Sequence, residues 1–444
     1  MSELPRRAVA RTARLAALPL GFAGRRAMGV GRRLGGTPAD TVLTDVQQRT
    51  AEQLFRTLGD LKGGAMKMGQ ALSIMESVLP ESQAAPYRDQ LTRLQDSAPP
   101  MSSATVHNVL ASELGTGWRK KLVEFSEVPA AAASIGQVHR ARWADGREVA
   151  VKVQYPGAGD ALMSDFRQIS RVARTFGSMV PGIDIKPLVA ELQDRLSEEL
   201  DYRLEAEAQH AFATEFRGDP EFTVPDVVEN TDKVLVTEWV ESTGSLARLI
   251  SEGTEQERNH YGSLYVRFLF EGPTRVGMLH ADPHPGNFRV LPTPDGSLGG
   301  LGVVDFGAVA RLPDRSLPRS IGSLIRIAMY DDYEDVLAGL RAEGFVKPNI
   351  TIDPGELRDY LSPFVEPAIP EVFAFSRSWM RDQFLRLGDP TAPGSTLALR
   401  INLPPSYLLI HRVWLGSIGV LCQLEATLPF RAILEEALPG FTEA

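Results

Sequence analysis

The sequence predicts an α+β protein built from two lobes, a small one rich in strands and a larger helical one. Two stretches with the period-two alternation of strands, Gly136 to Trp143 and Glu148 to Gln154, flank an Ala-Asp-Gly-Arg turn and indicate a hairpin. A helical pattern dominates from Leu317 onward. We expect the chain from Glu238 to Glu241 to join the lobes and to leave a cleft between them, where ligands commonly bind.

The composition is that of a globular protein with two or three domains. The 444 residues are 43% hydrophobic and 23% charged, which is ordinary for a soluble protein. The single cysteine, Cys422, excludes an intrachain disulfide and indicates a reducing compartment. Seven histidines are too few for a protein that stores metal.

The charge is concentrated at the N-terminal end. Residues 1–38 hold eight arginines and one acidic residue, Glu3, so this arm carries +7 and the rest of the chain carries −16. The arm is either a disordered basic tail or a segment attracted to anionic lipid. Nucleic acid is a poorer partner because the acidic body would repel it. Arginines continue beyond its short apolar stretch, which is not typical of a secretory signal.

The most apolar stretch, Val413 to Leu424, is too short for a membrane span. It has 12 residues, whereas a span needs about 20. We therefore expect no transmembrane span and interpret this stretch as a buried helix.

The remaining elements follow from periodicity along the chain. Apolar residues recur every three or four positions from Leu54 to Leu79, which predicts a helix over residues 40–80. The three glycines at 63, 64 and 69 suggest that this helix approaches another backbone closely. After a loop at 97–103 and the first hairpin, we expect helices over 159–174, 185–215 and 255–272, a β-ribbon over 223–241, and a hairpin turning at 294–296.

Four features occur in the order that a phosphoryl-transfer enzyme requires. They are a turn of small residues (PAAAASIGQ), a strand lysine (Lys152), the loop LHADPHPGNF with Asp282 and Asn287, and Asp305 after an apolar strand (VVDFG). A lysine on a rigid strand can hold phosphate oxygens, and carboxylate and amide oxygens can ligate Mg²⁺. The aspartate–asparagine spacing and the Asp-Phe-Gly match the protein-kinase signature.

A zinc site is the alternative for the histidine-containing loop. His280 and His284 lie four residues apart, but zinc needs a third and a fourth ligand, and no cysteine or further histidine lies nearby. The ordered set of four features favours a catalytic loop.

Six motifs together resemble the UbiB/AarF family of atypical kinases, also called ADCK proteins. They are KMGQ, AAASIGQVHRA, VAVKVQYPG, EELDYRLEAEA, LHADPHPGNF and VDFGAV, and they cover roughly residues 40–320. The resemblance implies a bilobal protein-kinase-like fold of class α+β, with a small β-rich N-lobe, a helical C-lobe and a helical N-terminal K-x-G-Q extension. The implied domains are a basic arm (1–38), the extension (39–120), the N-lobe (121–241) and the C-lobe (242–444).

The resemblance also assigns roles to residues. The K-x-G-Q motif, which folds over the cleft in the family, corresponds to Lys67, Gly69 and Gln70, and the E-x-D motif to Glu199 and Asp201. The nucleotide-binding residues would be Ala131, Ala132, Ala133, Ser134, Ile135, Gln137, Lys152, Glu238 and Val240.

The acidic partner of Lys152 is less certain. The family's helix glutamate is Glu205, which shares a predicted helix face with Asp201. Glu198 lies on the same stripe, so it stays open as the partner. A solvated acidic helix is the alternative for the whole stripe.

The resemblance implies ATP and Mg²⁺ as cofactors. Lys152, oriented by Glu205, would hold phosphates, Asp305 and Asn287 would bind Mg²⁺, and Asp282 would position the nucleophile. The usual arginine before the catalytic aspartate is Ala281, and the lysine two residues after it is His284. These departures favour ATP hydrolysis or a small-molecule acceptor over protein phosphorylation.

Quinone biosynthesis or lipid handling at the inner face of the membrane is the implied role, in a cytoplasmic peripheral protein. The implied partners are nucleotide, an anionic membrane or a quinone precursor, and copies of itself or biosynthetic enzymes. A nucleotide-gated scaffold and a true protein kinase are the alternatives.

Overall fold

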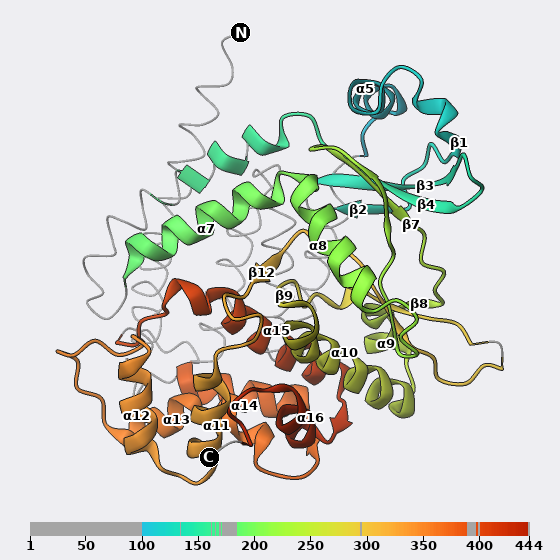
Figure 1. The fold of residues 1–444 in the computed structure, drawn as a ribbon. Helices are drawn as coiled ribbons and strands as arrows, with labels where there is room; N and C mark the ends of the chain where they lie inside the picture. The colour runs from blue at the N-terminus through green and yellow to red at the C-terminus, as the bar shows by residue number, and fades with distance from the viewer. Residues whose placement is uncertain are drawn as a thin grey trace, which may run out of the picture.

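The computed structural model describes residues 100–442, apart from 134, 161, 165, 168–169, 171–183, 294, 389–396 and 398–399. The predicted arm, the predicted helix over 40–80, and the candidate residues Lys67, Gly69, Gln70 and Ser134 lie outside this part of the chain. Within it, a small lobe built on a sheet stands over a larger helical lobe, as the sequence predicts (Figure 1).

The small lobe is built on a six-stranded sheet. Its main path runs β1 (Leu122–Phe125), β3 (Gly136–Trp143), β4 (Glu148–Gln154), β7 (Val234–Glu238) and β6 (Val227–Asn230), while β2 (Ala131–Ala133) pairs with β3. The bounds of β3 and β4 are the predicted ones. Gly136 is required in β3 because a Cβ there would lie 2.3 Å from the backbone oxygen of Val153.

Successive side chains of β4 point to opposite faces of the sheet, and Lys152 lies on the face opposite the buried valines. Val149, Val151 and Val153 are fully buried and share a core with α5 (Ser103–Glu113) and the 3-10 helix η1 (Trp118–Lys120). Lys152 therefore points to the opposite face, toward the large lobe. Residues 103–120, assigned to the extension above, pack in this core of the small lobe.

The predicted single helix over 185–215 is wrong: the chain forms two helices, α7 (Ile185–Glu199) and α8 (Tyr202–Glu215). Asp201 has an extended backbone and is the N-cap of α8, where its carboxylate accepts from the backbone N–H of Arg203 at 3.0 Å. Gln154, at the end of β4, donates to the Leu200 carbonyl at 3.1 Å and holds the break in place. Asp201 consequently caps the helix that carries Glu205 and does not share its face.

The large lobe packs around α10 (Glu255–Val276), α15 (Leu408–Leu424) and α16 (Phe430–Ala437), with α9 (Leu246–Glu252) beside them. Helix α10 begins at a capping box on Thr254 and ends four residues later than predicted, at the left-handed Gly277. A second helical layer holds α11 (Arg319–Met329), α12 (Tyr333–Ala342), α13 (Pro354–Val365) and α14 (Arg377–Gly388).

Short strands line the upper edge of the large lobe. One sheet runs β5 (Phe222–Thr223), β11 (Leu301–Val303), β10 (Phe288–Val290) and β8 (Gly244–Ser245), and β9 (Met278–His280) pairs with β12 (Val309–Arg311). A further pair, β13 (Phe373–Ala374) and β14 (Thr427–Leu428), lies lower in the lobe. The loops after β9 and β11 carry the predicted catalytic residues.

Helix α15 is buried, as predicted from its sequence. Within the described residues, one helical stretch, Pro405–Leu424, is long and apolar enough to cross a membrane, with a mean hydropathy of 1.3. That stretch is 72% buried inside the fold, a value typical of a core helix.

Candidate active site

A cavity of about 450 Å³ lies between the two lobes. Both lobes contribute to it, as the sequence predicts for a nucleotide cleft. The predicted residues that line it are Ala131, Ala132, Ala133, Lys152, Glu205, Glu238, Val240, Asn287 and Asp305.

The centre of the site is an ion cluster around Lys152. Its Nζ lies 2.7 and 2.9 Å from the two carboxylate oxygens of Glu205 and 3.1 Å from Oδ1 of Asp305. Glu205 and Lys152 are only 4% and 13% exposed, whereas Asp305 is 32% exposed. Burial lowers the pKa of Lys152, but the charges of Asp305 and Glu205 outweigh burial and hold its pKa above the ordinary value. One cation thus faces two carboxylates, which leaves a net charge of −1.

Helix α8 supplies the acidic partner of Lys152, and that partner is Glu205. Glu198, the alternative left open by the sequence, lies on α7 and pairs with Arg195 at 2.7 Å. The ring of Tyr202, in the first turn of α8, lies 5.1 Å from the Lys152 ammonium and is fully buried. The break between α7 and α8 therefore sets the register that brings both Tyr202 and Glu205 to β4.

The Asp-Phe-Gly turn holds Asp305 in a strained conformation. Its φ of 65° is in the left-handed region, which non-glycine residues rarely adopt outside constrained sites. Phe306 anchors the turn because it is buried with Phe212 of α8, at a ring distance of 4.9 Å. On the other side, Nε2 of His280 lies 3.0 Å from the Asp305 carbonyl oxygen.

Asp282 is held by two groups, one of which sequence reasoning missed. Asn287 Nδ2, from the same loop, donates to its Oδ2 at 3.0 Å. Arg412 of α15 donates to its Oδ1 at 2.7 Å from 130 residues away. The only signal of Arg412 in the sequence is a basic residue directly before the apolar run of α15, and this signal does not point to Asp282.

The two histidines of the loop make separate contacts within the protein. His280 contacts the Asp305 carbonyl, and Nδ1 of His284 accepts from the backbone N–H of Gly286 at 3.2 Å, capping the 3-10 helix η2 (Pro285–Asn287). Burial lowers the pKa of both imidazoles. No group of three or more His, Cys, Asp or Glu side chains suited to a metal ion occurs among the described residues.

Two predicted nucleotide-binding side chains face away from the cavity. Gln137 is buried, where its Oε1 accepts from the backbone N–H of Met101 at 2.8 Å and its Nε2 meets His139 at 2.7 Å. Ile135 packs into a core with Tyr202 and Ala206. The prediction took the whole turn as a nucleotide cradle, whereas neither of these two side chains turns toward the cleft.

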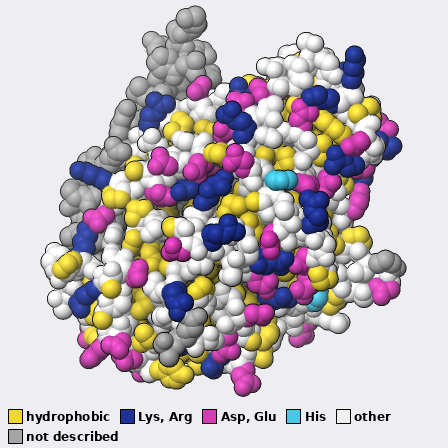
Figure 2. Space-filling model, in the orientation of Figure 1, with side chains coloured by type: hydrophobic (Ala, Val, Ile, Leu, Met, Phe, Trp, Pro, Cys, Tyr) yellow, Lys and Arg dark blue, Asp and Glu magenta, His cyan; other side chains and the backbone are white. Residues whose placement is uncertain are grey.

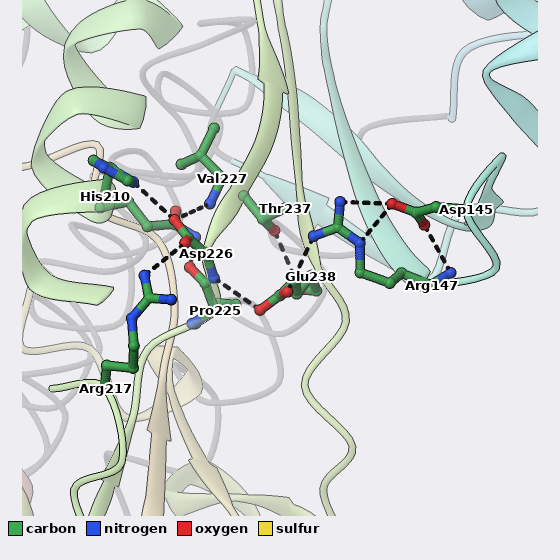
Figure 3. Close-up of polar contacts among 10 residues, drawn as sticks. Asp145, Arg147, His210, Arg217, Pro225, Asp226, Val227, Thr237 and Glu238 are labelled. Carbon is green, nitrogen blue, oxygen red and sulfur yellow. Dashed lines mark hydrogen bonds and ion pairs between the residues drawn. The ribbon is translucent and has the colours of Figure 1, made fainter. Parts of the chain in front are cut away.

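Charged side chains of the small lobe hold the end of β7, next to the predicted junction of the lobes. The carboxylate of Glu238 accepts from Arg147 of the β3–β4 turn and from the backbone N–H of Asp226, each at 3.2 Å (Figure 3). Asp226 in turn binds His210 at 2.9 Å and Arg217 at 3.2 Å. Because its carboxylate is engaged here, Glu238 can offer only its backbone to a ligand in the cleft.

Arg289 is a second residue that the sequence did not single out. It lines the cavity and donates from Nε to Ser242 Oγ at 3.1 Å, and none of the described carboxylates pairs with it. Burial lowers the pKa of its guanidinium. A half-buried cation without a carboxylate partner is unusual, because a desolvated charge normally needs a group of opposite charge nearby.

The side chains present fit a magnesium–nucleotide complex. Asp305 and Asn287 line one cavity and offer carboxylate and amide oxygens, the ligands that Mg²⁺ prefers. Asn287 uses its nitrogen toward Asp282, which leaves its side-chain oxygen for a metal. The excess negative charge around Lys152 suits an added cation. Glu199, from the predicted E-x-D motif, ends α7 half-buried, and Asp201 pairs with Arg203, so neither lines the cavity.

The chain is similar in sequence to a family model and to several known proteins. A family model described as the ABC1 atypical kinase-like domain matches residues 93–338. Atypical kinase coq-8, mitochondrial, from Caenorhabditis elegans is 30% identical over 357 residues, covering 78% of this chain and 46% of that protein. Atypical kinase COQ8B, mitochondrial, from Rattus norvegicus is 34% identical over 264 residues, covering 59% and 48%. The chain spans about half the length of the curated relatives it matches.

One solved structure matches over nearly the whole chain. The complex of Rv3197 with erythromycin, from Mycobacterium tuberculosis, is 41% identical, covers 92% of this chain and 100% of that chain, and superposes with a TM-score of 0.67.

Proposed function

Because the chain belongs to the UbiB/ADCK family, whose members carry the ABC1 atypical kinase-like domain, we propose that it is an atypical kinase or ATPase that uses Mg-ATP. The observation that carries this proposal is the contact of Lys152 with both Glu205 and Asp305 across the cleft, at 2.7 and 3.1 Å. Strand, helix and loop supply these three groups, in the arrangement that phosphoryl transfer needs for positioning and charge neutralisation.

Each side chain then has a defined task. Lys152, fixed by Glu205, would contact phosphate oxygens, and Asp305 and Asn287 would hold Mg²⁺, which neutralises developing charge when bound. Asp282 would orient the attacking hydroxyl or water. Arg412 would keep the Asp282 carboxylate in place, because it is the strongest polar contact that this carboxylate makes.

The proposed acceptor is water or a small molecule, such as a lipid or quinone precursor. His284 stands where protein kinases have a lysine, and it is engaged with the loop backbone. We propose that the chain works as a cytoplasmic protein at the inner face of the membrane. Acidic and basic side chains are interspersed over the face shown in Figure 2, so that face offers no basic surface for anionic lipid. The arginine-rich residues 1–38, which carry +7, would supply the membrane attraction.

The direct test is phosphate release from Mg-ATP by the full chain, with and without liposomes that contain anionic phospholipid. We expect release that Asp305→Asn reduces at least about 100-fold, since it removes a metal ligand. Asp295→Asn is the matched control, because Asp295 is exposed in a loop outside the cavity. No release under either condition, with Asp305→Asn indistinguishable from the unaltered chain, would falsify the proposal.

A nucleotide-gated scaffold is a second candidate, and one observation favours it. Both oxygens of Asp282 already accept a hydrogen bond, one from Arg412 and one from Asn287, so a substrate hydroxyl would have to share an oxygen that is engaged. If Asp282→Asn keeps ATP binding and restores function in cells that lack the protein, turnover is dispensable and this second candidate holds.

A further inference from the structure

A second cavity of about 410 Å³ lies inside the large lobe, away from the cleft. Helices α11, α12, α13 and α15 form most of its walls, together with Leu188 of α7 and residues 401–403. The wall side chains are mainly aliphatic and aromatic, such as Leu324, Leu340, Phe364 and Trp414. Its size is within the range of small-molecule sites, about 300–1,000 Å³. None of the described residues that line it is Lys, Arg, Asp or Glu. A ligand here would therefore be apolar over most of its length and would carry no charge.

Two polar side chains of this cavity are already used within the protein. The amide of Asn402 is used on both sides, by the backbone N–H of Asp184 at 3.0 Å and by the Gly344 carbonyl at 3.2 Å. The Tyr407 hydroxyl donates to Glu343 at 2.6 Å and contacts Ser320 at 2.9 Å.

Three polar groups of the lining make no hydrogen bond to the described residues: the His411 imidazole, the Tyr360 hydroxyl and the indole N–H of Trp414. The ring of His411 packs against Phe364 at 5.7 Å. Burial lowers the pKa of His411, so its imidazole is neutral. A neutral imidazole donates one hydrogen bond and accepts another, which matches a hydroxyl or a carbonyl.

The cavity shares a helix with the active site. His411 and Trp414 of α15 line the cavity, and Arg412, between them, donates to Asp282 at 2.7 Å. A molecule that packs against this helix therefore contacts the element that positions Asp282. Since α11, α12, α13 and α15 all contribute to the cavity walls, a ligand would also fix α15 relative to the other three helices.

We propose that this cavity binds a neutral molecule with a hydrocarbon chain and a single hydroxyl or carbonyl head, the head at His411 and the chain among α11, α12 and α13. Binding by itself is independent of ATP use. Its consequence for turnover, through Arg412 and Asp282, rests on the proposed function.

The binding test uses the fluorescence of Trp414 and a brominated long-chain alcohol, since bromine quenches an indole that it touches. The full chain is titrated without nucleotide, below the concentration at which the alcohol aggregates. We expect saturable quenching that Trp414→Phe removes, which separates Trp414 from the other four tryptophans. An unsaturable signal, or quenching that persists in Trp414→Phe, overturns the proposal.

Two variants test where the ligand binds and which residue contacts its head group. Ala328 is buried and lines the cavity, so Ala328→Phe should weaken binding at least about tenfold. Ala342→Phe, at an exposed position on α12, is the matched control. His411→Phe keeps a ring against Phe364 and should weaken the alcohol about tenfold while leaving the brominated alkane unchanged. Equal losses for alcohol and alkane would exclude His411 as the partner of the head.

A brominated fatty acid with the same chain tests the neutrality of the ligand. No cation among the described residues lines the cavity, so the carboxylate should bind at least about tenfold more weakly than the alcohol. Tighter binding of the acid overturns the proposal. Because these titrations contain no ATP, their failure leaves the proposed function standing. The absence of phosphate release likewise leaves the binding result intact.

Discussion

Replacing Glu205 by Gln tests the centre of the site most directly. Glu205 and Lys152 are 4% and 13% exposed, and both carboxylate oxygens lie within 2.9 Å of Nζ. Breaking a buried ion pair usually costs about 3–5 kcal/mol. Here Asp305 remains 3.1 Å from Nζ and the glutamine oxygen can still accept, so we expect a loss near the lower bound or below it, about 2 kcal/mol.

The thermal midpoint and the kinetics should change together. A loss of about 2 kcal/mol corresponds to roughly 4 °C in the melting temperature of a domain this large. Since Lys152 also loses its orientation, kcat/KM for ATP should fall about 100-fold, which corresponds to about 2.7 kcal/mol of transition-state stabilisation. Thermal unfolding and phosphate release measure the two effects.

The matched control for this prediction is Glu198→Gln. Glu198 pairs with Arg195 on the exposed face of α7, and such pairs contribute about 0.5 kcal/mol or less. Its melting temperature and kcat/KM should stay close to those of the unaltered chain. If Glu205→Gln and Glu198→Gln behave alike in both measurements, Glu205 does not hold Lys152 in solution.

Three further predictions concern residues around the cleft. Arg412→Leu should lower kcat for phosphate release about tenfold and leave the KM for ATP within about twofold, because it frees Asp282 without touching the nucleotide cavity. Arg289→Leu should raise the free energy of unfolding by about 1 kcal/mol, because it removes a desolvated cation, and should also raise the KM for ATP; urea unfolding and steady-state kinetics check both signs. The pKa values of His280 and His284 are lowered by burial, so the unfolded chain binds more protons below pH 6.5. Stability should therefore fall as the pH falls from 6.5, by at most about 1.4 kcal/mol per pH unit for each imidazole, and His284→Gln should flatten that slope in urea titrations.

The strands of the small lobe could be predicted because a half-buried strand alternates apolar and polar residues, and this alternation is visible in the sequence. The valines of β4 alternate with Ala150 and Lys152, so the sequence predicts both the strand and the face on which the lysine lies. Helix boundaries are less visible. The apolar pattern continues from α7 into α8, and the Asp201 cap that separates them could equally be an ordinary acidic residue within one long helix.

The candidate site could be predicted where short motifs carry it. Asp282 and Asn287 lie in one short loop with the spacing of the protein-kinase signature, and Asp305 follows a buried strand. Arg412 could not be predicted, because its contact joins positions 130 residues apart and depends on how α15 packs under the loop. Arg289 could not be identified as a cavity residue from the sequence, because an arginine on a short strand most often lies at the surface.

The Lys152–Asp305 contact joins the small lobe to the large one, and this sets how the cleft can work. In the absence of nucleotide, Lys152 balances two carboxylates, so the ion pair itself draws the lobes together. Under the proposed function, phosphate oxygens would take the place of Asp305 at Lys152, and Asp305 would help to hold a divalent cation. Every charge keeps a partner in this exchange, so the site does not have to desolvate an unpaired ion. We expect Asp305 to be the group that moves, since it is the most exposed member of the cluster. Phe306 and His280 anchor its turn, and its own Oδ1 adds one acceptor, at 3.3 Å from the backbone nitrogen of Gly307. Glu205, nearly buried and bidentate on Lys152, stays in place and keeps the lysine aimed into the cleft throughout.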